Sequence, residues 1–282
     1  MGAPMALHVL NAGHRLAVWN RTPDRAAELV AAGAVGAASP AEAARDAGAV
    51  VCMLADPDAA REVLLGPGGV AEGAVAGTLV IDCSTIGPAT AKELAAALGE
   101  RGLRYVDAPV LGSVVPAREG RLAVFAGGSA ADYAEAEPLL HLWGDPMKVR
   151  HVGAVGSASA VKLVINLTLA IAMSGVGEAL RLAGHLGIDR HAALDALAEG
   201  PLSATVASKR TMLDEEEYSP VGFSLDLLAK DLGLVLDAAY GDLPVTESVL
   251  AVVREAVSAG HRDDDYAALA GYLAFEDRPN SY

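Results

Sequence analysis

Residues 78–107 read TLVIDCSTIGPATAKELAAALGERGLRYVD, and their hydrophobic pattern identifies the class of the first domain. The apolar run Thr78–Asp82 predicts a strand, Ala89–Arg101 predicts a helix, and Arg104–Asp107 predicts a second strand. A strand, a helix and a strand in this order are typical of a parallel sheet with a right-handed crossover. The stretch therefore predicts an α/β domain.

The same alternation extends outward over the first half of the chain. Further strands are expected at Arg15–Trp19, Ala49–Leu54, Leu122–Ala126 and Met147–His151, and further helices at Pro23–Ala32, Pro40–Ala47, Asp58–Leu65 and Ala130–His141. Ser39 with Glu42 three residues later, and Pro40 between them, is the pattern of a capping box with proline at the first helical position. We expect a mostly parallel sheet with helices on both faces.

The pattern changes after about Gly153, because no later segment has the character of a strand. Helices are expected at Ser157–Leu186, Arg190–Glu199, Val206–Leu213, Leu225–Tyr240, Glu247–Ala259 and Asp264–Ala274, and the polar tail Glu276–Tyr282 is expected to be loose. The sequence thus predicts a doubly wound α/β domain over residues 1–152. An all-helical domain over residues 153–282 follows it, and a long helix joins the two.

The first residues do not match the usual start of a doubly wound domain, which is a strand followed by a G-x-G-x-x-G turn. Met1–Ala12 is predicted to be a helix that ends at Gly13. Gly2 stands where the third glycine of the turn would fall. We therefore expect a first strand and the first four positions of the turn, roughly ten residues, upstream of Met1. Either the start codon has been placed at an internal methionine, or the protein begins here and binds its cofactor poorly or not at all.

Composition narrows the class of protein. The 282 residues carry 21 Lys and Arg against 36 Asp and Glu, a net charge of -15, which argues against non-specific nucleic-acid binding. Cys52 and Cys83 lie in apolar runs and are expected to be buried free thiols, which suits a reducing cytoplasm. The apolar stretch Leu163–Gly177 is too short for a typical membrane span, so a buried helix is expected. Asp263–Asp265 is interpreted as an acidic helix start, and no metal site is expected.

Several segments, taken in order, resemble the β-hydroxyacid dehydrogenase family. They are MGAPMA at 1–6, GHR at 13–15, WNRT at 19–22, DCSTI at 82–86, DAPV at 107–110, the K-x-x-x-N pair Lys162 and Asn166, and KDL at 230–232. This family includes 3-hydroxyisobutyrate dehydrogenase, tartronate semialdehyde reductase and the glyoxylate/succinic semialdehyde reductases. The resemblance implies an N-terminal Rossmann domain that binds a nicotinamide dinucleotide and a C-terminal helical domain that forms the core of a dimer.

Lys162 is the predicted catalytic residue. It lies in a very apolar helix, and Asn166 is four residues on, so both project from one face. A partly desolvated lysine can exchange a proton near neutral pH. The resemblance implies that Lys162 is the general acid and base and that Asn166 orients the substrate oxygen. The alternative is a structural lysine that extends to solvent.

Arg21 is the residue that bears on cofactor choice. It follows the second strand of a Rossmann unit, where an acidic residue would favour NAD and an arginine accommodates the 2′-phosphate of NADP. NADP(H) is therefore expected to be preferred, with NAD(H) possible. The cofactor-binding residues predicted from position and resemblance are Gly2, Asn20, Arg21, Thr22, Leu54, Thr85 and Lys230.

Ser84 and Gly112 are the predicted substrate-binding residues. The resemblance implies that Ser84 helps hold a substrate carboxylate, although Ser84 or Thr85 could also cap the helix after Pro88. Gly112 permits close backbone approach. Many members have Ser-Gly-Gly where this chain has Leu111-Gly112-Ser113, so a substrate cannot be copied from them.

These observations predict a cytoplasmic NADP-dependent oxidoreductase that interconverts a small β-hydroxyacid and its aldehyde or keto form. A homodimer or higher homo-oligomer is expected, with no nucleic-acid or membrane partner. Two alternatives stay open. One is an imine reductase, against which Lys162 argues, because those enzymes often replace this lysine. The other is a cofactor-deficient relative that acts as a dimeric binding protein.

Overall fold

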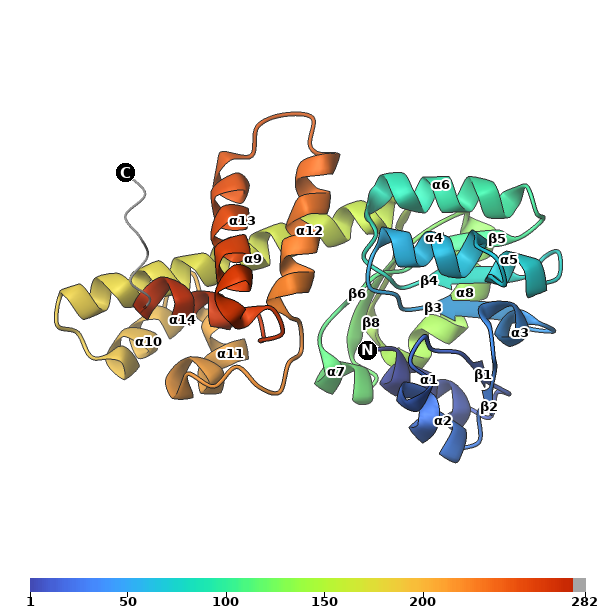
Figure 1. The fold of residues 1–282 in the computed structure, drawn as a ribbon, viewed down its shortest axis with the longest axis horizontal. Coiled ribbons are helices and arrows are strands. Elements are labelled where there is room, and N and C mark those ends of the chain that lie inside the picture. The colour runs from blue at the N-terminus through green and yellow to red at the C-terminus, as the bar shows by residue number, and fades with distance from the viewer. Residues whose placement is uncertain (276–282) are drawn as a thin grey trace. The chain divides into compact units, whose positions relative to one another are not determined.

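The computed structural model describes residues 1–275 and divides into two compact units (Figure 1). The first unit, Met1–Leu163, alternates strands with helices, and the second, from Val164 onward, contains helices without strands among its described residues. The long helix α9 (Ser157–His185) passes from one unit into the other. The predicted fold class, an α/β Rossmann domain followed by a helical domain, is confirmed.

A six-stranded sheet organises the first unit. Its strands are β3 (Ala49–Cys52), β4 (Leu79–Asp82), β5 (Arg104–Asp107), β6 (Val110–Leu111), β7 (Leu122–Gly127) and β8 (Gly144–Gly153). Strands β3, β4 and β5 are parallel neighbours, and β4 and β5 align so that Asp82 stands opposite Asp107. Strand β7 runs antiparallel to both β5 and β6, while β8 is parallel to β7. The sheet is therefore mixed at the β7 side and parallel at its β3–β5 side.

A second, two-stranded sheet pairs β1 (Ala17–Val18) with β2 (Val35–Gly36). No strand among residues 1–275 pairs with both β1 and β3, so the sheet that the alternation predicted as continuous is divided at this point. Strand β2 was not predicted, because two residues are too few to show a period of two.

Helices cover both faces of the main sheet, as expected. Those of the first unit are α1 (Gly2–Asn11), the 3-10 helix η1 (Pro23–Ala26), α2 (Ala27–Ala31), α3 (Pro40–Ala44), α4 (Pro57–Leu65), α5 (Val70–Gly73), α6 (Gly87–Gly99), α7 (Val114–Arg118) and α8 (Ala130–Trp143). The capping box is present: Ser39 Oγ accepts from the Glu42 amide at 3.1 Å, and Glu42 Oε2 accepts from the Ala38 amide at 2.7 Å.

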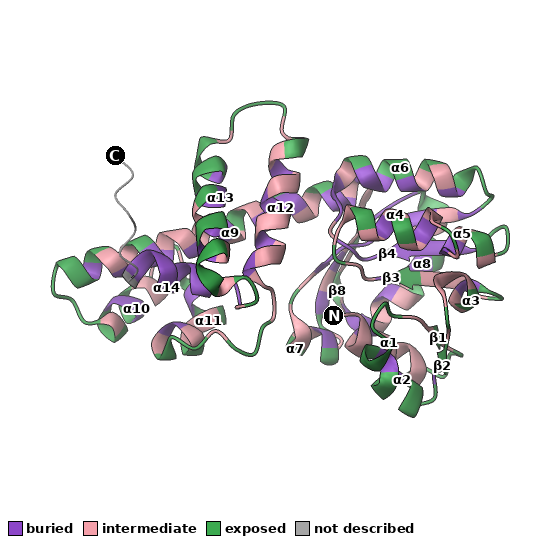
Figure 2. Cartoon of the chain, viewed as in Figure 1, coloured by how far each residue is buried: buried purple, intermediate pink, exposed green. Residues whose placement is uncertain are grey.

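The buried strand β4 separates two apolar layers (Figure 2). Leu79 and Ile81 pack on one side with Leu140 and Trp143 of α8. Val80 packs on the opposite side with residues of α4 and α6 such as Leu94. Alternate residues of one strand thus face opposite layers, as the pleat of a strand requires. Cys52 and Cys83 are buried free thiols, as predicted.

The second unit is built from helices around α9. They are α10 (Arg190–Ala198), α11 (Ser203–Glu215), α12 (Leu225–Ala238), α13 (Pro244–Ala256), the π-helical turn η2 (Val257–His261) and α14 (Ala268–Phe275). Helix α9 contributes Met173, Val176 and Leu180 to their common core. The predicted loose tail, Glu276–Tyr282, lies outside the described residues.

By length and composition α9 is also long and apolar enough to cross a membrane, and 39% of its most apolar 18-residue window is buried inside the structure. A core helix of a globular protein passes the same test, so this one helix is weak grounds for a membrane assignment.

Asp265 is the polar centre of the helical unit. Its carboxylate is completely buried, and Lys209 Nζ lies 2.7 Å from Oδ1. The amides of Gly222 and Phe223 donate to Oδ2 at 2.9 and 3.3 Å, and the Ala267 amide donates to Oδ1 at 3.1 Å. The interpretation of Asp263–Asp265 as an acidic helix start is therefore too simple. One of its three carboxylates, that of Asp265, is buried and binds groups from α11, from residues 222–223 and from Ala267.

We expect Asp265→Ala to lower the free energy of unfolding by about 3–5 kcal/mol, because it leaves Lys209, whose side chain is 13% exposed, without its counter-ion and three amides without an acceptor. Urea titration followed by far-UV circular dichroism measures the change. Asp263→Ala is the matched control, since Asp263 is exposed, and it should leave stability nearly unchanged. Equal loss in both variants would contradict the role of Asp265.

Candidate active site

The carboxyl ends of β4 and β5 place two buried carboxylates side by side. Asp82 Oδ1 accepts from the Ser84 amide at 2.9 Å, and its Oδ2 accepts from the Tyr105 hydroxyl at 3.1 Å. Burial raises the pKa of Asp82, and the hydrogen bonds from Ser84 and Tyr105 oppose this shift. The hydrogen bond from Tyr105 to Asp82 thus joins β5 to the end of β4 through polar groups.

Ser84 and Leu54, predicted for substrate and cofactor respectively, are brought together by this network. The Leu54 amide donates to Ser84 Oγ at 2.9 Å, which joins the end of β3 to the end of β4. Ser84 is 2% exposed, so its hydroxyl serves the protein's own backbone. It does not cap α6, which begins at Gly87. Thr85 follows directly and is half-buried. A substrate role for Ser84 stays a prediction.

Asp107 connects the sheet to the start of α9. Its Oδ1 accepts from the Gly156 amide at 2.9 Å, and its Oδ2 accepts from the Ser159 amide at 2.8 Å. Burial raises the pKa of Asp107, and the two amide hydrogen bonds oppose this shift. The first turn of a helix has amides without partners inside the helix. Asp107 satisfies two such amides from a strand about fifty residues earlier.

Lys162 and Asn166 lie four residues apart on α9, as predicted. Lys162 is half-buried, and Asn166 is 2% exposed. Asn166 Nδ2 donates to Asp231 Oδ2, and Lys230 Nζ forms an ion pair with Asp231 Oδ1 at 2.7 Å.

Asp231, which follows Lys230 in the KDL segment, is 1% exposed and is therefore not a surface charge of α12. It lies on the face of α12 that also buries Leu228, Leu232 and Val235. Asp231 and Asp107 are the two residues that sequence reasoning missed. Both lie in segments, KDL and DAPV, that carry the family resemblance, but nothing in the sequence shows which groups their carboxylates contact.

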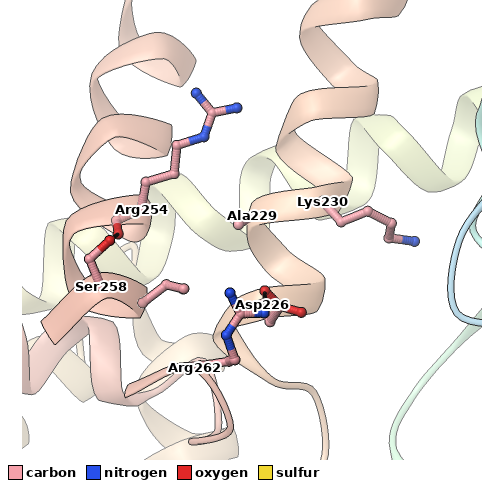
Figure 3. A pocket seen from close by; sticks show the side chains of 7 residues that line it. Asp226, Ala229, Lys230, Arg254, Ser258 and Arg262 are labelled. Atoms are coloured by element: carbon pink, nitrogen blue, oxygen red, sulfur yellow. Dashed lines mark hydrogen bonds and ion pairs between the residues drawn. The ribbon is translucent and has the colours of Figure 1, made fainter. Parts of the chain in front are cut away.

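Lys230 also lines a cavity of about 480 Å³ in the helical unit (Figure 3). Its other lining residues are Asp226, Ala229, Arg254, Val257, Ser258 and Arg262. Arg262 is paired with Asp226 at 2.6 Å. The side chains of Lys230 and Arg254 point away from this pair and from each other (Figure 3). The cavity is basic in composition, but its cations do not converge on one point.

The predicted dinucleotide-binding residues of the N-terminal segment are mostly exposed. Gly2 begins α1, where an added Cβ would lie 3.5 Å from Met53 Cβ. Asn20 Oδ1 accepts from the Thr22 amide at 2.9 Å, which shapes the turn after β1. Arg21 is exposed, and no carboxylate among residues 1–275 forms an ion pair with it. The N-terminus of a ten-residue helix and an unpaired guanidinium are groups that suit phosphates, so the residues present fit a nicotinamide dinucleotide.

Gly112 adopts a backbone conformation that requires glycine. Its φ is +131°, and an added Cβ would lie 2.7 Å from Leu122 Cδ2 and 3.2 Å from Pro116 Cβ. It follows β6 directly, with half-buried Leu111 before it and half-buried Ser113 after it. Any other residue at 112 would strain the backbone and require the Leu122 and Pro116 side chains to shift.

Two family models match this chain in order, and together they span residues 1–273. Residues 1–156 match the model of the NAD-binding domain of 6-phosphogluconate dehydrogenase, and residues 156–273 match the NAD-binding model of NADP-dependent 3-hydroxyisobutyrate dehydrogenase. Mitochondrial 3-hydroxyisobutyrate dehydrogenase of Mus musculus is 34% identical, over 98% of this chain and 85% of that protein. Glyoxylate/succinic semialdehyde reductase 1 of Arabidopsis thaliana is 32% identical, over 98% and 96%.

The crystal structure of 3-hydroxyisobutyrate dehydrogenase from Salmonella typhimurium has a TM-score of 0.85 and 31% sequence identity, over 96% of this chain and 95% of that one. Its likeness covers the alternating unit and the helical unit together. With both family models matched in order and relatives above 30% identity over nearly the full length, the chain belongs to the β-hydroxyacid dehydrogenase family of NAD(P)-dependent oxidoreductases.

Proposed function

We propose that the protein interconverts a small β-hydroxyacid and its aldehyde or keto form, with NADP(H) as the preferred cofactor. The observation that supports this most directly is the arrangement on α9. Asp107 holds the first turn of the helix, Lys162 follows within the next turn, and Asp231 fixes Asn166 by a hydrogen bond. A half-buried lysine and a fixed amide on one helix face suit proton transfer to and from a substrate oxygen.

When bound, the nicotinamide supplies the hydride in reduction and takes it up in oxidation. Lys162 donates a proton from Nζ to the carbonyl oxygen in reduction and accepts the hydroxyl proton in oxidation. The Asn166 amide donates one N–H to Asp231 and has a second N–H that orients the reacting oxygen of the substrate. The buried environment of Asn166 limits its rotation, so the orientation is set before substrate binds.

The substrate carboxylate is assigned to the turn at Gly112, with Ser84 as a further contact. Leu111 stands where many relatives have a serine, which removes a hydroxyl donor and adds apolar bulk beside the turn. We therefore assign a small acid with an apolar substituent in preference to a more polar hydroxyacid. A panel of aldehydes, keto acids and hydroxyacids, followed at the absorbance band of the reduced nicotinamide, identifies the substrate.

The cofactor is assigned to Gly2, Asn20, Arg21 and Thr22, together with Leu54, Thr85 and Lys230. NADP(H) is preferred because Arg21 is exposed and has no carboxylate partner among residues 1–275, and NAD(H) stays possible. The free thiols of Cys52 and Cys83 suit the cytoplasm. The imine-reductase and binding-protein alternatives both predict no turnover of hydroxyacids, so the same panel separates either of them from the proposed function.

Lys162→Ala should lower kcat by about 10²–10⁴-fold, because general acid–base assistance is typically of that size. Lys162→Arg should not restore activity, because a guanidinium does not release its proton near neutral pH. Asn166→Ala should cost less, because the proton source remains. Steady-state rates and thermal melts on the same preparations measure these effects. Lys148→Ala, which removes an exposed lysine, is the control. A folded and fully active Lys162→Ala variant would sink the mechanism.

Arg21→Asp should weaken NADPH binding by roughly 10–100-fold, because it replaces a charge-assisted phosphate contact with a repelling carboxylate. NADH binding should change much less, because NADH has no 2′-phosphate. Fluorescence titration with each cofactor measures both constants. Arg25→Asp makes the same change of charge four residues along the chain and should affect the two cofactors alike. If Arg21→Asp also affects them alike, Arg21 is not the selector.

The helical unit is proposed to form a homodimer or higher homo-oligomer. Leu182 of α9 and Leu186, four residues on, are 59% and 66% exposed, so the end of this helix offers an apolar contact to a second copy of the chain. We expect a dimer mass or above by light scattering at micromolar concentration. Leu182→Glu with Leu186→Glu should shift the mass to a monomer, whereas Met147→Glu in the first unit should not. A monomeric mass for the unmodified protein would contradict the proposal.

A further inference from the structure

We propose that Asp107 is the positioning residue for Lys162: its carboxylate clamps the first turn of α9 to the sheet and so sets where the lysine ammonium is held. The inference rests on the proposed function of Lys162. It assigns a role to a side chain that touches neither cofactor nor substrate in the mechanism above.

The clamp is rigid on the sheet side. Asp107 ends β5, which pairs in register with β4 over four residues. Gly127 of β7 stands opposite Asp107, and a Cβ at Gly127 would lie 2.5 Å from Asp107 Oδ1 and 3.1 Å from the Ala158 amide nitrogen. Only glycine therefore lets the carboxylate and the helix start approach this closely.

The clamp is equally defined on the helix side. Gly156 has φ +91°, and a Cβ there would lie 3.0 Å from Lys92 Cε and 3.2 Å from the Pro88 carbonyl oxygen. The chain thus enters α9 through a closely packed glycine. Hydrogen bonds at Gly156 and at Ser159 hold two points of the first turn, which sets both the height of the helix and its rotation.

Lys162 follows Ser159 by three residues, which is less than one helical turn and about 4.5 Å along the axis. No flexible segment lies between the clamp and the lysine, because α9 is continuous from Ser157. A shift or rotation of the first turn is therefore transmitted to the Cα atom of Lys162.

A carboxylate is the only side chain of this length that accepts two amide hydrogen bonds on separate oxygens. An asparagine would offer one oxygen and one NH₂, and the NH₂ would face a backbone N–H. The negative charge also balances the partial positive charge of the helix start. The other titratable groups around the clamp are Asp82 and Tyr105 on the sheet and Lys92 beside Gly156.

The test compares Asp107→Asn with Gly127→Ala, which keeps every charge but crowds the carboxylate. Ser39→Ala removes the side-chain cap of α3 in the same unit and is the matched control for the simple loss of a helix cap. Each variant is assayed for kcat, for KM, for NADPH affinity by fluorescence and for thermal melting. A fifth readout needs no turnover: the pH dependence of acylation of Lys162 by acetic anhydride, measured by peptide mass spectrometry on the cofactor-free protein.

For Asp107→Asn we expect kcat to fall by about 10–100-fold, because a displacement of about 1 Å in a catalytic group can cost ~100-fold. NADPH affinity should stay unchanged. The acylation midpoint of Lys162 should shift, because its ammonium is held in different surroundings once the first turn of α9 is released. Gly127→Ala should lower kcat and shift the midpoint in the same way, and it decides the matter if Asp107→Asn does not fold. Ser39→Ala should lower the melting temperature alone.

An unchanged kcat in both variants, or losses that merely follow melting temperature as in Ser39→Ala, would overturn the positioning role. If the proposed function is wrong, Lys162→Ala stays active. The acylation midpoint of Lys162, compared between Asp107→Asn and the unmodified protein, still reports whether Asp107 governs the surroundings of the lysine.

Discussion

The paired hydrogen bonds from the amides of Gly156 and Ser159 to Asp107 are the contact on which the candidate site depends. A sheet and a helix that follow one another in a chain can pack in many ways. Hydrogen bonds from two amides to the two oxygens of one buried carboxylate restrict how the start of α9 can lie against β5. The requirement for glycine at 127 follows from the same contact, because the helix start and the strand end approach more closely than any larger residue allows.

A second carboxylate has the corresponding role further along α9. Asp231 holds Asn166 and is itself paired with Lys230, so an amide, an acid and a lysine from two helices form one cluster, in which the amide and the acid are buried. Asp107 accepts hydrogen bonds from backbone amides at the start of α9, and Asp231 accepts one from the Asn166 side chain. Neither acid is itself assigned a chemical step. The same helix thus has its lysine located by a strand of the first unit and its asparagine located by a helix of the second.

Where the sequence pattern was strong, the predicted elements agree with the structure. Arg104–Asp107 is a strand with the predicted bounds, and α9 ends one residue before its predicted end. Strand β6 and the short helices α5 and α7 were missed, because two to five residues show no recognisable period.

The clamp was missed for a different reason. Asp107 and Ser159 are 52 residues apart, and Asn166 and Asp231 are 65 apart, so no local pattern records that they meet. Motifs identified the participants Lys162, Asn166 and Asp107, but only the three-dimensional structure assigns the acids their partners.

Asp82 and Asp107, the buried carboxylates at the carboxyl ends of β4 and β5, affect how the stability of the fold depends on pH. Their pKa values are raised by burial, so this pair takes up protons on folding, and its contribution to stability declines as pH rises through the folded-state values. Glu93 and Asp214 have pKa values lowered by hydrogen bonds from arginines, and their contribution is lost instead as pH falls. As pH falls, these surface ion pairs therefore lose their contribution to stability, while the acids beneath the candidate site favour the folded state as protons are added.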